Sequence, residues 1–150
     1  MKEISKKINI IIIHGPNLNL LGNREPDLYG TFTLKEINKK IKEFARSKSV
    51  KIKTFQSNHE GRIIDCIQKA GKKYKSIIIN PGAYTHYSYA IRDAVAAVSI
   101  PVVEVHLTDI HNREKFRKTS VIAPVCLDQI TGLGVNSYLK GIERIVEEVR

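Results

Sequence analysis

The apolar residues of the chain fall into short β-branched runs that alternate with stretches of helical spacing. The first run, Ile10 to Ile13, stops at the sequence His-Gly-Pro-Asn. An apolar run that ends in glycine and proline is typical of a strand buried on both faces. The segment 15–32 that follows has neither a helical nor an alternating period, and segments of this kind are usually lids or binding loops. We therefore expect functional residues directly after the first strand.

Helices and strands then follow in alternation. Apolar residues at helical spacing predict helices over 34–47, 60–74, 88–98 and 138–149, and Thr33 with Glu36 forms a capping-box pattern at the first of them. Further strands are predicted over 50–56, 76–80, 102–106 and 121–126. This alternation predicts an α/β fold over residues 1–150, as one domain with a parallel sheet and helices on both faces. Five strands of this size favour the flavodoxin-like order 2-1-3-4-5.

A sheet of this topology binds ligands beyond the carboxyl ends of its strands, at the switch point between strands one and three. The loops after Ile13, Ile79 and Val105 should therefore share one cleft. They carry amide, phenol, imidazole and guanidinium side chains, namely Asn17, Arg24, Tyr29, Asn80, Tyr84, His86, His106, Thr108, Arg113 and Arg117. Neither GxGxxG nor GxxxxGK[ST] follows the first strand, which argues against a nucleotide or flavin site.

Charge and composition narrow the choice of partner. The 150 residues are 42% hydrophobic, enough for one core, and the net charge of +10 favours an anionic partner. That partner is a nucleic acid, a phosphate or a small carboxylate. Many lysines are spaced as on a solvated helix face, for example Lys35, Lys39 and Lys42, so nucleic-acid binding is not expected.

The cysteines, the histidines and the N-terminus indicate the compartment of the protein and argue against a metal site, a signal peptide and a membrane span. Cys66 and Cys126 lie in apolar surroundings without a CxxC spacing, as reduced thiols of a cytoplasmic protein do. No histidine pair has the spacing of metal ligands, so no metal site is expected. The N-terminal apolar run is broken by Asn9, which argues against a signal peptide and a membrane span.

Five sequence strings in order resemble those of the type II 3-dehydroquinate dehydratases. They are GPNLNLLG, REPDLYG, NPGAYTH, EVH and GLG, and they match at the expected spacing over essentially the whole chain. The resemblance implies a flavodoxin-like subunit in a homododecamer of four trimers, with no cofactor. It also implies the dehydration of 3-dehydroquinate to 3-dehydroshikimate, by anti elimination through an enolate, in the shikimate pathway or in quinate catabolism.

The same resemblance implies that Tyr29 is the base that removes the C2 proton. A free tyrosine has a pKa of about 10, so a nearby cation is needed to stabilise the phenolate. Arg24 matches that cation, with Arg117 as a second contributor, whereas Arg113 resembles a lid partner more than a ligand. Taken alone, Tyr29 would be a loop residue anchored by packing.

The family resemblance also implies the acid, the enolate stabiliser and the residues that bind the substrate. His106 matches the general acid that protonates the departing C1 hydroxyl, with Glu104 to orient it, and Asn17 matches the residue that stabilises the enolate. In isolation these residues would be a strand-end histidine, a surface carboxylate and a turn-closing asparagine. The residues that match substrate ligands are Asn80, His86, Asp93, Leu107, Thr108 and Arg117, of which Asp93 reaches the site of a neighbouring subunit.

Two departures from the family pattern stand close to these motifs. Thr108-Asp109 replaces a common Ser-Asn, and the extra acid would weaken carboxylate binding if its side chain turned inward. His14 stands where many members have Asn or Gln, and no role is assigned to it. Gly22 and Gly30 bracket the Arg24 to Tyr29 segment and are expected to serve as hinges of a lid.

Two other functions remain as alternatives. One is a flavodoxin-like module that binds an anionic ligand or nucleotide without chemistry, and the other is nucleic-acid binding, with an affinity that falls steeply as salt rises. Replacement of Tyr29 by phenylalanine separates the enzyme from the binding module, because only an enzyme has turnover to lose.

Overall fold

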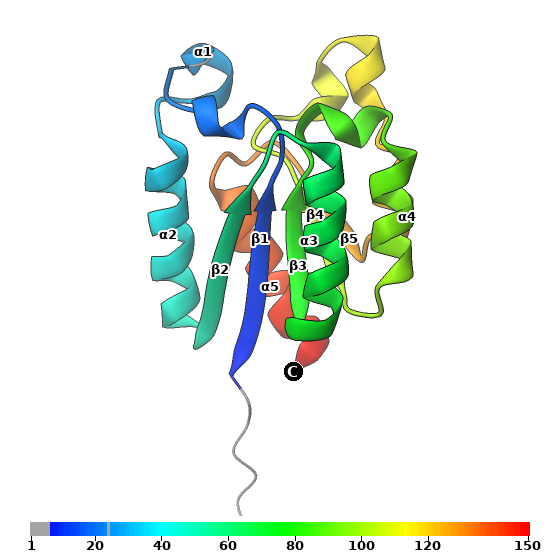
Figure 1. The fold of residues 1–150 in the computed structure, drawn as a ribbon. Helices are drawn as coiled ribbons and strands as arrows, with labels where there is room; N and C mark the ends of the chain where they lie inside the picture. The colour runs from blue at the N-terminus through cyan, green and yellow to red at the C-terminus, as the bar shows by residue number, and fades with distance from the viewer. Residues whose placement is uncertain (1–6, 24) are drawn as a thin grey trace, which may run out of the picture.

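A computed structural model describes residues 7–23 and 25–150 of the chain. Its centre is a parallel sheet in which the strands lie in the order β2-β1-β3-β4-β5 (Figure 1). The strands are β1 (Ile8–His14), β2 (Val50–Gln56), β3 (Ser76–Asn80), β4 (Val102–Val105) and β5 (Asp128–Ile130). The predicted fold class and strand order are therefore confirmed.

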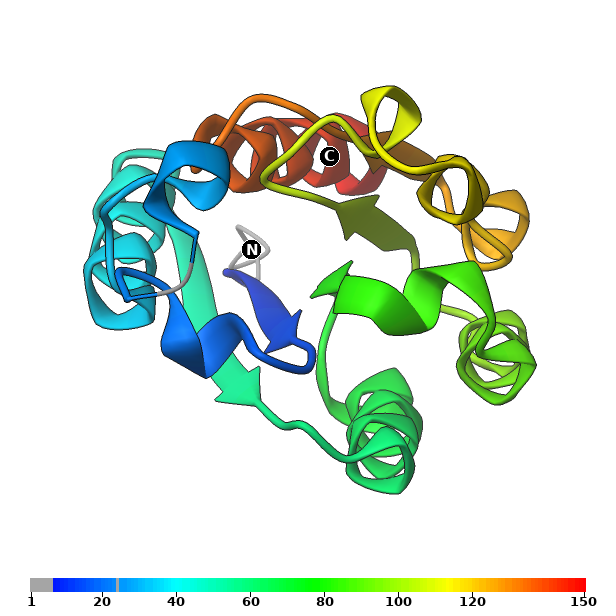
Figure 2. The same ribbon diagram turned by 90° about the horizontal axis from the view of Figure 1, so that it is seen from above.

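Two layers of helices cover the sheet (Figure 2). The helices α2 (Leu34–Ser47) and α5 (Asn136–Val149) pack on one face, and α3 (Glu60–Lys73) and α4 (Tyr89–Ala97) pack on the other. Successive side chains of a strand point to opposite faces. In β1, Ile10 and Ile12 therefore join the core under α2 and α5, whereas Ile11 and Ile13 join the core under α3 and α4.

Local signals account for most of the element boundaries. The bounds of α2, β2 and β3 are the predicted ones, and the Thr33 side chain accepts a hydrogen bond of 3.2 Å from the Glu36 N–H at the start of α2. Helix α4 begins after Ser88, whose side chain caps the Ile91 N–H at 3.0 Å. Helix α3 and strand β4 each end one residue early, and α5 begins before the predicted Tyr138.

The prediction of a strand over 121–126 is wrong. That segment contains a 3-10 turn, Ala123–Val125, and Pro124 has no N–H to donate to a neighbouring strand. The fifth strand lies further along the chain, where Asp128–Ile130 pairs with β4. Ile122 is fully buried on the α3 and α4 side, and Val121, Val125 and Cys126 are partly buried against the same core. In sequence, an apolar run that is buried by packing against helices has the same pattern as a strand buried in a sheet.

Short helical turns gather beyond the carboxyl ends of the strands, at the top of Figure 1. The segment 15–32, in which no period was expected, contains the turns η1 (Leu18–Leu20) and α1 (Pro26–Tyr29), both too short to show a period in sequence. The others are η2 (Gly82–His86), η3 (Ile110–Asn112) and η4 (Lys115–Lys118). Within the part of the chain that the structure describes, no helix is long and apolar enough to cross a membrane.

Candidate active site

A cleft of about 140 Å³ opens at the carboxyl ends of β1, β3 and β4. The loops after these three strands all contribute to its wall, so the prediction that they share one cleft is confirmed. The site residues that it brings together are Asn17, Tyr29, Asn80, His86, His106, Leu107, Thr108 and Arg117. The wall also includes Arg113.

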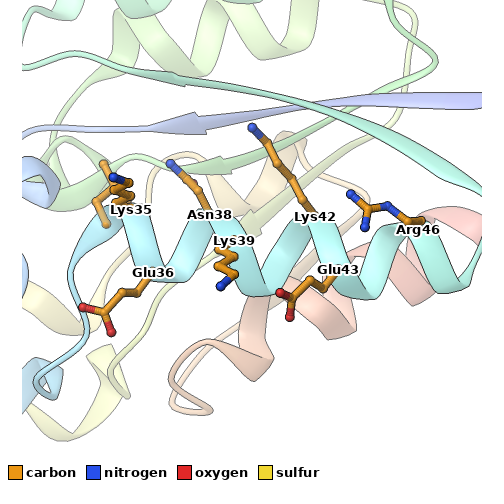
Figure 3. A pocket seen from close by; sticks show the side chains of 8 residues that line it. Lys35, Glu36, Asn38, Lys39, Lys42, Glu43 and Arg46 are labelled. Carbon is orange, nitrogen blue, oxygen red and sulfur yellow. The ribbon is translucent and has the colours of Figure 1, made fainter.

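A wider hollow lies along the outer face of α2 (Figure 3). It is lined by charged side chains of both signs, such as Lys35, Glu36, Lys39 and Glu43, at the spacing of a solvated helix face. Its titratable groups are common surface lysines and glutamates. The cleft at the strand ends is the better candidate, because phenol, imidazole, amide and guanidinium groups converge there.

Tyr29 reaches the cleft from the last residue of α1 and meets an arginine from a distant loop. Nη1 of Arg113 donates a hydrogen bond of 2.9 Å to the Tyr29 hydroxyl oxygen, and the guanidinium carbon lies 5.4 Å from the ring centroid. Arg113, expected to be a lid partner more than a ligand, thus contacts the tyrosine of the segment that is predicted to form the lid. Arg24, the predicted cation, lies outside the described residues. The spacing of the two residues in the sequence carries no signal of the contact.

His106 is held by a buried carboxylate at the end of β4. Its Nε2 donates to Glu104, which also accepts hydrogen bonds from Thr85 at 2.9 Å, Ser120 at 2.8 Å and Gln129 at 2.8 Å. Burial raises the pKa of Glu104, but the hydrogen bonds and the charge of His106 outweigh it, so the net pKa is below the usual value. The carboxylate is therefore ionised, and Nδ1 is the ring nitrogen of His106 that remains for a ligand.

His86 and Asn80 present polar atoms from the loop after β3. Nδ1 of His86 donates to the Thr119 carbonyl oxygen at 2.7 Å, and burial lowers the pKa of this histidine below its usual value. The ring is therefore neutral at pH 7, and Nε2 can accept a hydrogen bond from a hydroxyl group. The Asn80 side chain accepts from the Gly82 N–H at 3.1 Å and donates to the Tyr138 oxygen at 3.1 Å.

Asn17 lines the cleft in a left-handed backbone conformation, with φ of 70°. Asparagine is one of the few residues other than glycine that adopt this conformation readily. The carbonyl oxygen of Asn17 accepts from the Leu20 N–H at 3.0 Å, and its N–H donates to the Asn58 side chain at 3.0 Å. Asn17 thus closes the turn after Pro16 and also lines the cleft, so the two interpretations of this residue are compatible.

The loop after β4 presents backbone groups to the cleft. Within residues 7–23 and 25–150, neither Leu107 nor Thr108 donates its backbone N–H to another group, and both residues line the cleft. Asp109 faces elsewhere, because its carboxylate accepts from the His111 N–H at 3.0 Å and from the Asn112 side chain at 2.6 Å. The departure at Asp109 therefore adds no acid to the wall of the cleft.

The remaining predicted site residues lie at the rim or beyond it. Arg117 lines the cleft and pairs with Glu114, with 2.8 Å between Nε and Oε2. Asp93 lies on the exposed side of α4 and does not line the cleft of its own chain. Over the part of the chain that the structure describes, the wall thus includes two arginines and no carboxylate, because Glu104 is fully buried behind His106, and this favours an anionic ligand. Among the described residues, no group of three or more His, Cys, Asp or Glu side chains is arranged to hold a metal ion.

Comparison with known sequences identifies relatives over nearly the full chain. A model of the family described as Dehydroquinase class II matches residues 8–146. The 3-dehydroquinate dehydratase of Halothermothrix orenii is 56% identical over 141 residues, which cover 94% of this chain and 95% of the relative. The 3-dehydroquinate dehydratase of Bacillus licheniformis is 56% identical over 130 residues, which cover 87% of this chain and 90% of the relative.

Solved structures agree with the sequence comparison. The type II dehydroquinase of Butyrivibrio crossotus has a TM-score of 0.91 at 48% identity, over 93% of this chain and 97% of that one. The type II dehydroquinase of Propionibacterium acnes has a TM-score of 0.90 at 34% identity, over 93% of this chain and 96% of that one. The similarity therefore extends to the whole arrangement of elements that forms the cleft.

Proposed function

Because this chain belongs to the class II dehydroquinase family, and is therefore a lyase that dehydrates 3-dehydroquinate in the shikimate pathway, we propose that the cleft at the strand ends is its active site. One observation carries this proposal. A tyrosine oxygen held by a guanidinium and an imidazole held by a buried carboxylate line the same cleft. Such a pair supplies the base and the acid that an elimination needs.

Tyr29 is the base in this proposal. Its phenolate oxygen takes the C2 proton of the substrate, and the electrons of the C–H bond form an enolate with the C3 carbonyl. The guanidinium of Arg113, 2.9 Å from the Tyr29 oxygen, stabilises negative charge on that oxygen. Arg24 is retained as a second cation on the strength of the REPDLYG motif.

His106 completes the elimination. Collapse of the enolate forms the C1–C2 double bond and breaks the C1–O bond, while the imidazolium donates its Nδ1 proton to the departing hydroxyl, which leaves as water. The ionised Glu104 stabilises the imidazolium before the transfer. Asn17 hydrogen-bonds the enolate oxygen, directly or through a water molecule, in the manner of an oxyanion hole.

The other cleft residues bind the substrate. The backbone N–H groups of Leu107 and Thr108 hold the substrate carboxylate, while Asn80, His86 and Arg117 hold its hydroxyl groups. This assignment is supported by the positive charge of the cleft and by the donors that its wall presents. The reaction then needs no cofactor, because the side chains supply both proton transfers.

We also propose that residues 1–150 form a single catalytic domain of a homododecamer, a tetramer of trimers, in the cytoplasm. Asp93 would reach the cleft of a neighbouring subunit of the trimer. Its exposed position on α4, near the exposed Tyr87 and Tyr89, supports this arrangement, and the free thiols of Cys66 and Cys126 support a reducing compartment. Sedimentation of the purified protein measures the mass of the assembly, and a monomer would contradict the dodecamer.

Substitution of Tyr29 by phenylalanine tests the proposed site. Turnover is followed by the ultraviolet absorbance of the conjugated enone product, with and without a chelator and after borohydride treatment. We expect Tyr29→Phe to lower kcat by about 10² to 10⁴, as for the loss of a general base, and to leave carboxylate binding in calorimetry nearly unchanged. Tyr74→Phe, away from the cleft, is the matched control. Full turnover by Tyr29→Phe would rule out the assigned base.

A further inference from the structure

His14 is a buried histidine that the proposed reaction does not use. It ends β1 and lies beside Asn80, the last residue of β3, in the parallel register of the two strands. Its Nε2 lies 2.7 Å from the Asn38 side-chain oxygen on α2, and its Nδ1 lies 2.9 Å from the Tyr138 oxygen on α5. Figure 3 shows Asn38 extending from α2 on the side opposite to Glu36. His14 thus joins β1 to both helices of this layer.

The chemistry of the partners determines which atoms donate. An amide oxygen only accepts, so Nε2 of His14 carries a hydrogen and donates to Asn38. Burial lowers the pKa of His14 to about 4, with the Asn38 hydrogen bond opposing, so the ring is neutral at pH 7 and Nδ1 is an acceptor. The Tyr138 hydroxyl therefore donates to Nδ1, and its oxygen accepts from the Asn80 amide.

This direction determines the orientation of the Asn80 amide. Its oxygen accepts from the Gly82 N–H and one of its two N–H groups donates to Tyr138, which leaves the other N–H for the cleft. A flipped amide would place its NH₂ against the Gly82 N–H. It would also place its oxygen against the Tyr138 oxygen, whose hydrogen is already donated to His14. Either contact leaves buried polar groups unpaired, which costs more than an ordinary hydrogen bond contributes.

We propose that His14 and Tyr138 are positioning residues that make Asn80 present an N–H, rather than its carbonyl oxygen, to a substrate oxygen in the cleft. The inference rests on the proposed function, in which Asn80 binds a substrate hydroxyl. The ligand group selected at this point is one that accepts a hydrogen bond. We call the chain of hydrogen bonds from Asn80 through Tyr138 and His14 to Asn38 the Asn80 relay.

Two substitutions of His14 separate this role from simple packing. His14→Leu removes the acceptor that orients Tyr138 and replaces the imidazole with an apolar side chain of similar size. His14→Asn introduces an amide oxygen that can take the place of Nδ1 as the acceptor for Tyr138. We expect His14→Leu to raise KM for 3-dehydroquinate about tenfold, the effect of one hydrogen bond, with a smaller change in kcat. His14→Asn should restore KM close to the wild-type value. Equal KM values for the two variants would overturn the proposal.

A double-mutant cycle with Tyr138→Phe tests whether the two residues act through one path. If both act on Asn80, His14→Leu combined with Tyr138→Phe raises KM no further than Tyr138→Phe alone. Additive effects would mean that they act independently, against the proposal. Ser76→Ala is the matched control, because it removes a buried hydrogen bond of 2.6 Å to the Pro101 carbonyl at the other end of β3. A similar rise in KM in this control would show that the rise in the His14 and Tyr138 variants comes from lost stability.

The tautomer of His14 is a test that does not depend on turnover. Long-range ¹H–¹⁵N spectra of the wild-type protein at neutral pH should show the His14 ring protonated at Nε2 alone. Protonation at Nδ1 would reverse the Asn80 relay and overturn the inference even if the enzyme is active. If the folded protein shows the expected tautomer but no turnover, the relay is supported and the proposed function is contradicted. Failure of the relay and failure of the proposed function are therefore distinguishable.

Discussion

Arg113 and Tyr29 stand 84 residues apart in the sequence and meet at the cleft, where the guanidinium donates a hydrogen bond of 2.9 Å to the tyrosine oxygen. The side chain of Arg113 is only 13% exposed. Solvent and salt therefore screen its charge less than that of a surface arginine. Among the described residues, Arg113 is therefore the cation that contacts the proposed base, Tyr29, most directly.

Removal of this cation should slow the proton transfer. We expect Arg113→Met to lower kcat about tenfold to a hundredfold, because a hydrogen bond to a charged group contributes about 1.5–3 kcal/mol. Steady-state kinetics with 3-dehydroquinate measures the effect. Arg144→Met on α5, which removes an arginine paired with Asp128 and Glu148 away from the cleft, is the control and should not change kcat. An unchanged kcat in Arg113→Met would transfer the role to Arg24.

We expect Glu104 to contribute to catalysis and to stability through its negative charge. Glu104→Gln keeps the size of the side chain but removes the negative charge beside His106, and it sets an amide NH₂ against groups that now donate to the carboxylate. We expect kcat to fall about tenfold or more and the protein to lose about 1–3 kcal/mol of stability, the cost of buried donors left unpaired. Kinetics and urea unfolding measure the two effects. Glu148→Gln on the exposed surface should change neither, and wild-type kcat in Glu104→Gln would exclude the charge effect.

Gly30 should be sensitive to a single added methyl group. Its φ of 83° and ψ of 178° lie in a region that is essentially limited to glycine, although a Cβ there would meet no atom within 4 Å. Gly30→Ala should therefore cost about 1–3 kcal/mol of backbone strain, relieved by movement of the adjacent Tyr29, and lower kcat. Gly61→Ala in α3, which also has open space, should instead stabilise the protein slightly. Matching kcat values in the two variants would show that Tyr29 tolerates the change.

Acid should destabilise the fold through His14. The ordinary pKa of 6.5 applies to the unfolded chain, whereas the folded pKa is about 4. Between these values the unfolded state binds more protons, so the free energy of unfolding falls as the pH falls, by about 3 kcal/mol in total. The groups that face the ring, Asn38 and Tyr138, carry no charge in this range. Urea midpoints from pH 7 to pH 4 should therefore fall more steeply in the wild type than in His14→Asn; parallel curves would contradict this contribution.

Several elements could be predicted because their signals are local. The cap at Thr33 and the apolar spacing of α2 lie within one helix, and the three isoleucines of β3 are followed closely by Pro81 and Gly82, which end the strand. Segment 121–126 was wrongly predicted as a strand, and β5 was missed, because burial by packing and burial by strand pairing select the same apolar residues. Only the register of Asp128 against Val103 decides which segment joins the sheet.

By itself, the sequence determined the alternation of strands and helices through its periodicity, and its short motifs determined which residue types follow the strands. The number and size of the strands only favoured the observed order, and the segment that pairs with β4 came from the structure. The tertiary structure alone decided that Arg113 meets Tyr29 and that His14, Tyr138 and Asn80 form one relay. Such contacts join side chains that are far apart in the chain. Their hydrogen-bond directions depend on which donors and acceptors the folded packing leaves for each other, and no local pattern of residues encodes that choice.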